Sequence, residues 1–365
     1  MDEVLRVKVV DSTKDGLSFN YKIHTVTNMD KCFSEPEMTT VRVYEDLQWL
    51  HYCIEQDEKS EGSIIPPLPN RPDPTTKGAL ARSKELLGGE SRVISEDVVQ
   101  RYCKAMERYL QILARHHAFR YNENFHRFLD TKELPAAVKT KKAWMKTLTH
   151  AVQEVKLHGH KDADEFFSEQ RSFIIQSCMR LRESSLAYSK MVTGEYRLSS
   201  TFSNLVKHSS LAGSSQAKND KPLHGVLVKF SEGLDHCRSA AEERARSDDF
   251  TLGFVINLYE KYSLKAKAVL HHRMVLLHKK ESTEKALEKS TKNRDDLEEK
   301  RDQAEAKFVA ISKTTRHELT QYHEQRVKAF QEFILQHAER HIAIARQLYA
   351  QLNKTIADLD KIDIE

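Results

Sequence analysis

The residues best spaced for chemistry are His337 and His341, which lie four positions apart in a helix-forming stretch. This separation places both imidazoles on one helix face, where they could hold a divalent metal ion. A zinc peptidase motif requires glutamate directly after the first histidine, but that position holds Ala338, and Glu339 follows it. We therefore interpret the pair as a helix-surface or dimer contact, and we predict no metal site and no cofactor.

Motifs of the common enzyme classes are missing from the sequence. It contains no P-loop, no GxSxG and no GxGxxG. The neighbours His116-His117 and His271-His272 would point to different helix faces, so they are poor ligand pairs. The five cysteines have no metal-like spacing, and their odd number fits a reducing cytosol. We therefore predict a protein that is not an enzyme and has no catalytic residues.

The charge of the chain is divided unevenly along its length. The net charge is +4, with −3 in residues 1–135 and +7 in residues 136–365. A basic helical part favours an acidic partner such as a lipid leaflet. Nucleic acid is an unfavourable partner, because the basic stretches lack interleaved stacking aromatics. The sequence shows no secretory leader and no apolar run of about 18 residues, so we expect a peripheral membrane protein.

A short basic segment, residues 136–160, has the pattern of an interfacial helix. Its apolar residues share one face with a tryptophan, and glutamate is rare in it. Such a helix lies well in a lipid interface. The alternative is a helix packed on its own domain with solvated lysines. The predicted lipid-binding residues are Lys139, Lys141, Lys142, Trp144, Met145, Lys146 and Leu148.

The last third of the chain positions the histidine pair. No proline follows Pro222 and no glycine follows Gly253, and the remainder is rich in strong helix formers. One straight helix would be about 170 Å long at about 1.5 Å per residue, so we predict two helices that fold back near Ser290–Asp296. With a helix over Asp164–Leu211, residues 161–365 would form three long helices, the second bending at Gly233 and Gly253.

The final helix carries an apolar seam at the period of one helix face. A long, thin helix with one apolar face must bury that face against other helices, and we expect a second chain to supply some of them. The seam residues that we predict at a dimer contact are Phe330, Ile334, Ile342 and Leu348.

Residues 1–135 read as a separate α+β domain. Alternating apolar residues predict two strands within residues 4–27 and a third over Met38–Tyr44. A helix over Glu45–Gln56 follows, then an extended proline loop, Ile64–Pro72, and a helix that begins at Ser95.

These segments resemble a known family. The strand end Val41-Arg42-Val43-Tyr44, the loop Pro66–Arg71 and the closing Phe125–Leu129 are similar to a PX (phox homology) domain. A PX domain followed by long helices resembles the PX-BAR sorting nexins, most closely the retromer-associated branch numbered five, six and thirty-two. The resemblance implies an α+β PX domain with a three-stranded sheet, then an all-α BAR domain whose three long helices form a curved dimeric coiled-coil bundle.

The resemblance also implies site residues. Arg42, Tyr44 and Arg71 would form a residual phosphoinositide pocket. Val43 stands where the family has its phosphate-binding arginine, and Tyr102 where a later helix has another, so we predict weak binding of phosphatidylinositol 3-phosphate. Val99 and Cys103 would line a groove for cargo tails that add a strand to the sheet edge.

The function that the resemblance implies is endosomal sorting. Such a protein would lie on early endosome membranes, curve or tubulate them, and take part in cargo sorting and retrograde transport to the Golgi. Its partners would be phosphoinositide-containing membrane, cargo receptor tails, and a sorting nexin of the one/two branch or a second copy of itself. The rival interpretation is a structural coiled-coil rod with an N-terminal docking domain.

Overall fold

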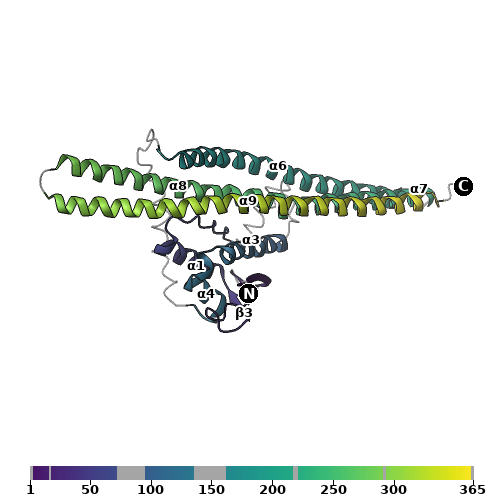
Figure 1. Cartoon of the computed structure of the whole chain (residues 1–365). Helices are drawn as coiled ribbons and strands as arrows, with labels where there is room; N and C mark the ends of the chain where they lie inside the picture. The colour runs from purple at the N-terminus through teal and green to yellow at the C-terminus, as the bar shows by residue number, and fades with distance from the viewer. Residues whose placement is uncertain are drawn as a thin grey trace. The chain divides into compact units, whose positions relative to one another are not determined.

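A computed structural model describes residues 3–15, 18–71, 95–134, 162–216, 221–290 and 293–362. These residues form two compact units. The first contains the described residues up to 179 together with 260–325, and the second contains 180–259 and 326–362. Three long helices contribute residues to both units: α6 (Glu165–Gln216), α8 (Leu252–Lys289) and α9 (Arg294–Leu359) (Figure 1).

The first unit begins with a three-stranded antiparallel sheet in the order β1-β2-β3, made of β1 (Leu5–Asp15), β2 (Ser18–Thr27) and β3 (Glu37–Arg42). Alternate side chains of β2 are buried, as the period of two predicts. The register of β1 against β2 shifts between Val9 and Asp11, which marks a bulge. The three strands predicted from alternation are therefore present.

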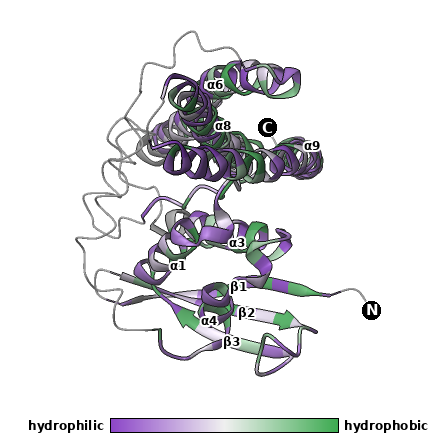
Figure 2. Ribbon diagram, turned by 60° about the vertical axis from the view of Figure 1, so that its left-hand side comes forward, coloured by the Kyte–Doolittle hydropathy of each residue, from purple (hydrophilic) through white to green (hydrophobic). Residues whose placement is uncertain are grey.

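Three helices cover this sheet and close its core: α1 (Tyr44–Gln56), α3 (Ser95–Arg115) and α4 (Glu123–Asp130). Two short 3-10 helices, η1 (Glu58–Ser60) and η2 (Phe119–Tyr121), connect them. Within this unit α1 and α3 lie between the sheet and the helical residues 260–325 (Figure 2). Leu47, Leu50 and Ile54, the apolar positions predicted on one face of α1, are fully buried.

The long helices are α6 (Glu165–Gln216), α7 (Lys221–Phe250), α8 (Leu252–Lys289) and α9 (Arg294–Leu359). The fold-back lies between Lys289 and Arg294, inside the predicted range, and Asn293 there has a φ of 56°. Asparagine tolerates this left-handed conformation better than most residues. The second predicted helix is interrupted at Thr251, two residues before Gly253. Sheet, helices and long helical region confirm the predicted fold class.

Candidate functional site

Arg42 ends β3 and is buried, with 2% of its surface exposed. Its Nε donates to the carbonyl oxygen of Phe128 at 2.8 Å, and the two terminal nitrogens reach four further carbonyl oxygens. The acceptors are the backbone oxygens of Val41, Arg127, Phe128, Thr131 and Lys132. Several of these lie at the C-terminal end of α4, where helix carbonyls lack intrahelical partners. The guanidinium is therefore fully engaged by backbone carbonyls, all but that of Val41 at or just after the C-terminal end of α4.

Tyr44 and Arg71 lie together beside the proline loop. The Tyr44 hydroxyl donates to the Pro69 carbonyl oxygen at 2.6 Å, and burial raises the pKa of Tyr44 to about 12. The Arg71 guanidinium lies 5.9 Å from the centre of the Tyr44 ring and forms an ion pair with Glu45. The Glu45 carboxylate thus pairs with the cation that a phosphate would need.

Tyr102 on α3 closes the same region. Its hydroxyl donates to the Arg71 carbonyl oxygen at 3.1 Å and so holds the end of the proline loop against α3. The predicted head-group residues therefore divide: Tyr44 and Arg71 are in contact, whereas the guanidinium of Arg42 is directed to α4.

Val99 and Cys103 are both half-buried on α3, packed against the core of the sheet domain. Burial raises the pKa of the Cys103 thiol, which lies beside Ser12 of β1. The sheet edge next to α3 is already bonded in part, because the Val9 amide donates to Glu107 Oε2 at 2.9 Å. The stretch of β1 beyond the bulge, Asp11–Asp15, is the part of this edge nearest to the predicted groove.

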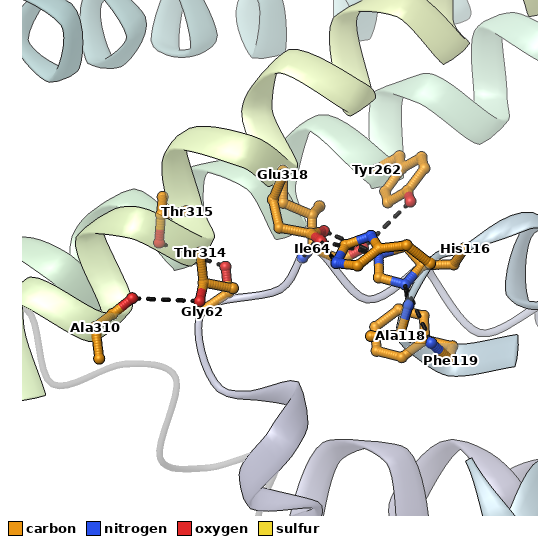
Figure 3. Close-up of polar contacts among 11 residues, drawn as sticks. Gly62, Ile64, His116, Ala118, Phe119, Tyr262, Ala310, Thr314, Thr315 and Glu318 are labelled. Atoms are coloured by element: carbon orange, nitrogen blue, oxygen red, sulfur yellow. Dashed lines mark hydrogen bonds and ion pairs between the residues drawn. The ribbon is translucent and has the colours of Figure 1, made fainter. Parts of the chain in front are cut away.

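A junction that sequence reasoning missed joins the sheet domain to α8 and α9 within the first unit (Figure 3). Glu318 of α9 is 3% exposed, and its Oε2 accepts from the Ile64 amide at 3.0 Å and contacts His116 Nε2 at 3.1 Å. Tyr262 of α8 donates to the Ile64 carbonyl oxygen at 3.2 Å. The loop after η1 is therefore held through both the N–H and the carbonyl oxygen of one residue, Ile64.

Electrostatics at this junction favour the charged carboxylate. Burial alone raises the pKa of Glu318, but hydrogen bonds from His116 and Ile64 outweigh it, and the net pKa is lowered. The His116 Nδ1 accepts from the Ala118 and Phe119 amides, each at 3.2 Å, so the proton of the neutral ring lies on Nε2 and points at Glu318. Gly62, with a φ of 86°, supplies the left-handed turn that brings Ile64 to the helices.

The predicted dimer seam is divided between two faces of α9. Phe330 packs on Tyr259 of its own chain, with ring centres 5.5 Å apart, and Leu348 is half-buried. Ile334 and Ile342 are about half exposed, at 49% and 51%. They belong to a stripe of exposed apolar residues that recurs every seven or eight positions: Val327, Ile334, Ile342, Tyr349 and Ile356. This spacing is that of a coiled-coil contact.

The predicted lipid-binding residues of the linker, Lys139, Lys141, Lys142, Trp144, Met145, Lys146 and Leu148, lie outside the described residues. Among the described helices, none is long and apolar enough to span a bilayer.

Comparisons with known proteins agree with this architecture. The PX domain profile matches residues 30–132, and the profile described as Vps5 C terminal like matches residues 141–296. Sorting nexin-6 of Homo sapiens is 28% identical over 381 residues, covering 96% of this chain and 92% of that protein. Sorting nexin-32 of Mus musculus is 24% identical over 385 residues, covering 98% of this chain and 93% of that protein.

The solved structures add a similar fold. The cryo-EM structure of the SNX-BAR Mvp1 tetramer superposes with a TM-score of 0.62 at 14% identity, over 96% of this chain and 99% of that one.

Proposed function

Because this chain belongs to the PX-BAR sorting nexins, a family of membrane-associated transport proteins that are not enzymes, we propose that it sorts cargo on endosomal membranes by binding cargo tails rather than phosphatidylinositol 3-phosphate. The relatives sorting nexin-6 and sorting nexin-32 belong to the branch that the sequence resembles. The proposal includes retrograde transport from endosome to Golgi and a position on early endosomes. Membership in this family disfavours the rival interpretation of a structural rod.

The observation that carries the choice of ligand is the state of the two arginines. Arg42 donates all its N–H groups to backbone carbonyls, and Arg71 is paired with Glu45. A phosphate would have to displace these partners, and each missing charge-assisted hydrogen bond weakens binding by about 1.5–3 kcal/mol. Two such losses correspond to roughly a hundredfold or more in affinity.

The lipid arm of the test titrates the full chain with soluble phosphatidylinositol 3-phosphate head group by calorimetry. We expect no binding in the micromolar range. Micromolar binding that Arg71→Ala and Tyr44→Phe abolish would overturn this part of the proposal. Arg42→Ala is unsuitable as the lipid variant, because it would also leave the end of α4 without its donors.

The cargo arm of the test uses peptides from the cytoplasmic tails of cycling receptors, displayed as an array and probed with the full chain. Val99→Asp should weaken capture of any peptide that adds a strand beside α3. Gln100→Asp, on an exposed position one residue further along α3, is the matched control and should leave capture unchanged. Equal capture by both variants would contradict a groove at Val99 and Cys103.

Dimer formation completes the proposal. The exposed stripe of α9 offers apolar side chains that another helix would bury, each contributing about 1.5–3 kcal/mol when fully buried. The partner is a sorting nexin of the one/two branch or a second copy of the chain. The linker, residues 136–160, would then insert its Trp144 face into the membrane that the dimer curves.

A further inference from the structure

Asp248 is a buried carboxylate near the end of α7, with its side chain 3% exposed. A buried carboxylate requires a compensating cation or several hydrogen-bond donors. Its Oδ1 lies 3.1 Å from His337 Nδ1 and 2.5 Å from His341 Nε2, both on α9. No lysine or arginine contacts this carboxylate among the residues that the structure describes. Two imidazole nitrogens from one helix thus converge on one carboxylate oxygen from another.

The helix break beside this cluster fixes its geometry. The Thr251 hydroxyl donates to the Ser247 carbonyl oxygen at 2.6 Å. The Thr251 hydroxyl oxygen then lies 3.4 Å from His337 Nδ1. Gly253 permits close packing here, because an added Cβ would lie 3.0 Å from the Asp248 carbonyl oxygen and 3.2 Å from the Tyr188 ring. Tyr188 of α6 lies close to the Asp248 carboxylate, and burial, followed by the charge of Asp248, raises the pKa of its phenol.

The three ligand atoms have the spacing that a tetrahedral ion needs. They all lie within 4.8 Å of one another. Bonds of about 2.1 Å to a tetrahedral zinc ion place ligand atoms about 3.4 Å apart, so small rotations of the two rings are sufficient. The histidine side chains are 24% and 32% exposed, and solvent can therefore reach a fourth position.

The sequence alone favours a surface or dimer contact for the two histidines, but it does not show Asp248 beside them. We propose that Asp248, His337 and His341 bind one Zn²⁺ ion that cross-links α7 to α9 beside the break at Thr251. Two imidazoles and one carboxylate form a donor set that suits zinc, with water as the fourth ligand. The ion would replace the protons that the two rings direct at Asp248 and would neutralise the buried charge. With one ligand from α7 and two from α9, the ion would hold the bend between α7 and α8 against α9.

A second cluster, His116, His117 and Glu318, has similar spacing, but the His116 nitrogen that faces the other two residues carries a proton and cannot bind a metal ion. The His116 Nδ1 already accepts two backbone amides, so its Nε2 must keep its proton to stay neutral. A metal at Nε2 would require an imidazolate, which is unfavourable for a structural site. This cluster therefore serves as the internal control for zinc binding.

The test titrates metal-free full chain with Zn²⁺ by calorimetry and with Co²⁺ by visible absorption, which is intense for tetrahedral sites. We expect one site, a tetrahedral Co²⁺ spectrum, and a higher melting temperature with Zn²⁺. His337→Gln and His341→Gln should each weaken binding by about tenfold or more, since even second-shell changes weaken metal sites by about 10–100-fold. Both variants keep the buried Asp248, whereas Asp248→Asn would test the site only if the chain still folds without that charge.

The matched control is the double variant His116→Gln with His117→Gln, because the chain has 18 histidines that could bind metal weakly. It should bind Zn²⁺ as the parent chain does. Absence of a site tighter than about 100 μM would overturn the proposal. Binding that survives the joint loss of His337 and His341, or that disappears in the control, would overturn it as well.

Discussion

Removal of Glu318 should loosen the contact between the sheet domain and α9. In Glu318→Ala, the Ile64 amide and the His116 Nε2–H lose their acceptor while they remain buried. Each unsatisfied buried donor costs about 1–3 kcal/mol, so the two donors together cost roughly 2–6 kcal/mol. Even the lower bound corresponds to roughly 30-fold more frequent opening of this junction.

Hydrogen exchange is the appropriate measurement, because local opening is read directly at single amides. The Ile64 amide should exchange at least about 30-fold faster in Glu318→Ala than in the parent chain. Glu318→Gln keeps an acceptor oxygen and should show a smaller effect. Glu324→Ala, an exposed position on the same helix, is the matched control and should exchange like the parent.

Unchanged protection of Ile64 in Glu318→Ala would refute this reasoning. It would mean that peripheral ion pairs such as Lys265 with Glu55, at 3.0 Å, hold the junction alone. Exposed pairs usually contribute only about 0–1 kcal/mol, so this outcome would require several of them to act together.

Three further predictions concern assembly, membrane and pH. Ile334→Glu with Ile342→Glu should give a monomer in sedimentation without unfolding the chain, since both side chains are half exposed; a persistent dimer would place the contact elsewhere. Trp144→Glu with Leu148→Glu should abolish vesicle tubulation while dimerisation survives, and unchanged tubulation would favour a linker helix that packs on protein. The lowered pKa of Glu318 contributes stability that is present above its ordinary value of 4.5 and lost as the pH falls through the folded value. Protection of Ile64 should therefore fall in acid in the parent chain and less steeply in Glu318→Gln, with parallel pH profiles counting against this role.

Much of the fold follows from local patterns. The alternation in residues 4–27 predicts two strands because only one face of the sheet is buried. The fold-back near Asn293 is predictable since the chain there is polar and a longer helix would have no domain to pack against. The interruption at Thr251 is less visible, because the nearby Gly253 shows only that backbone and ring approach closely there.

The sites depend on pairings between distant residues, which periodicity does not reveal. Arg42 matches a motif position, yet four of its five partners are carbonyls more than 80 residues later in the chain. Glu318 looks like one more charge on a mixed helix face, but in the fold it accepts from Ile64, 254 residues earlier. The sequence gives one indication that such a glutamate is buried: it stands at a position where the apolar face of the helix would otherwise continue.

The final helix illustrates why one apolar pattern can have two meanings. A period near 3.6 assigns Phe330, Ile334 and Leu348 to a single seam, because it tolerates a face wider than 100°. In the fold, Phe330 packs on its own chain and Ile334 faces outward. The single wide apolar face is therefore divided into an inner face and an outer stripe. The inner face packs within the chain, and the outer stripe, at steps of seven or eight, is exposed and available for the proposed dimer. A helix that must fold within its chain and also dimerise needs both faces, and a broad apolar seam on a thin helix is the sequence pattern that such a double requirement produces.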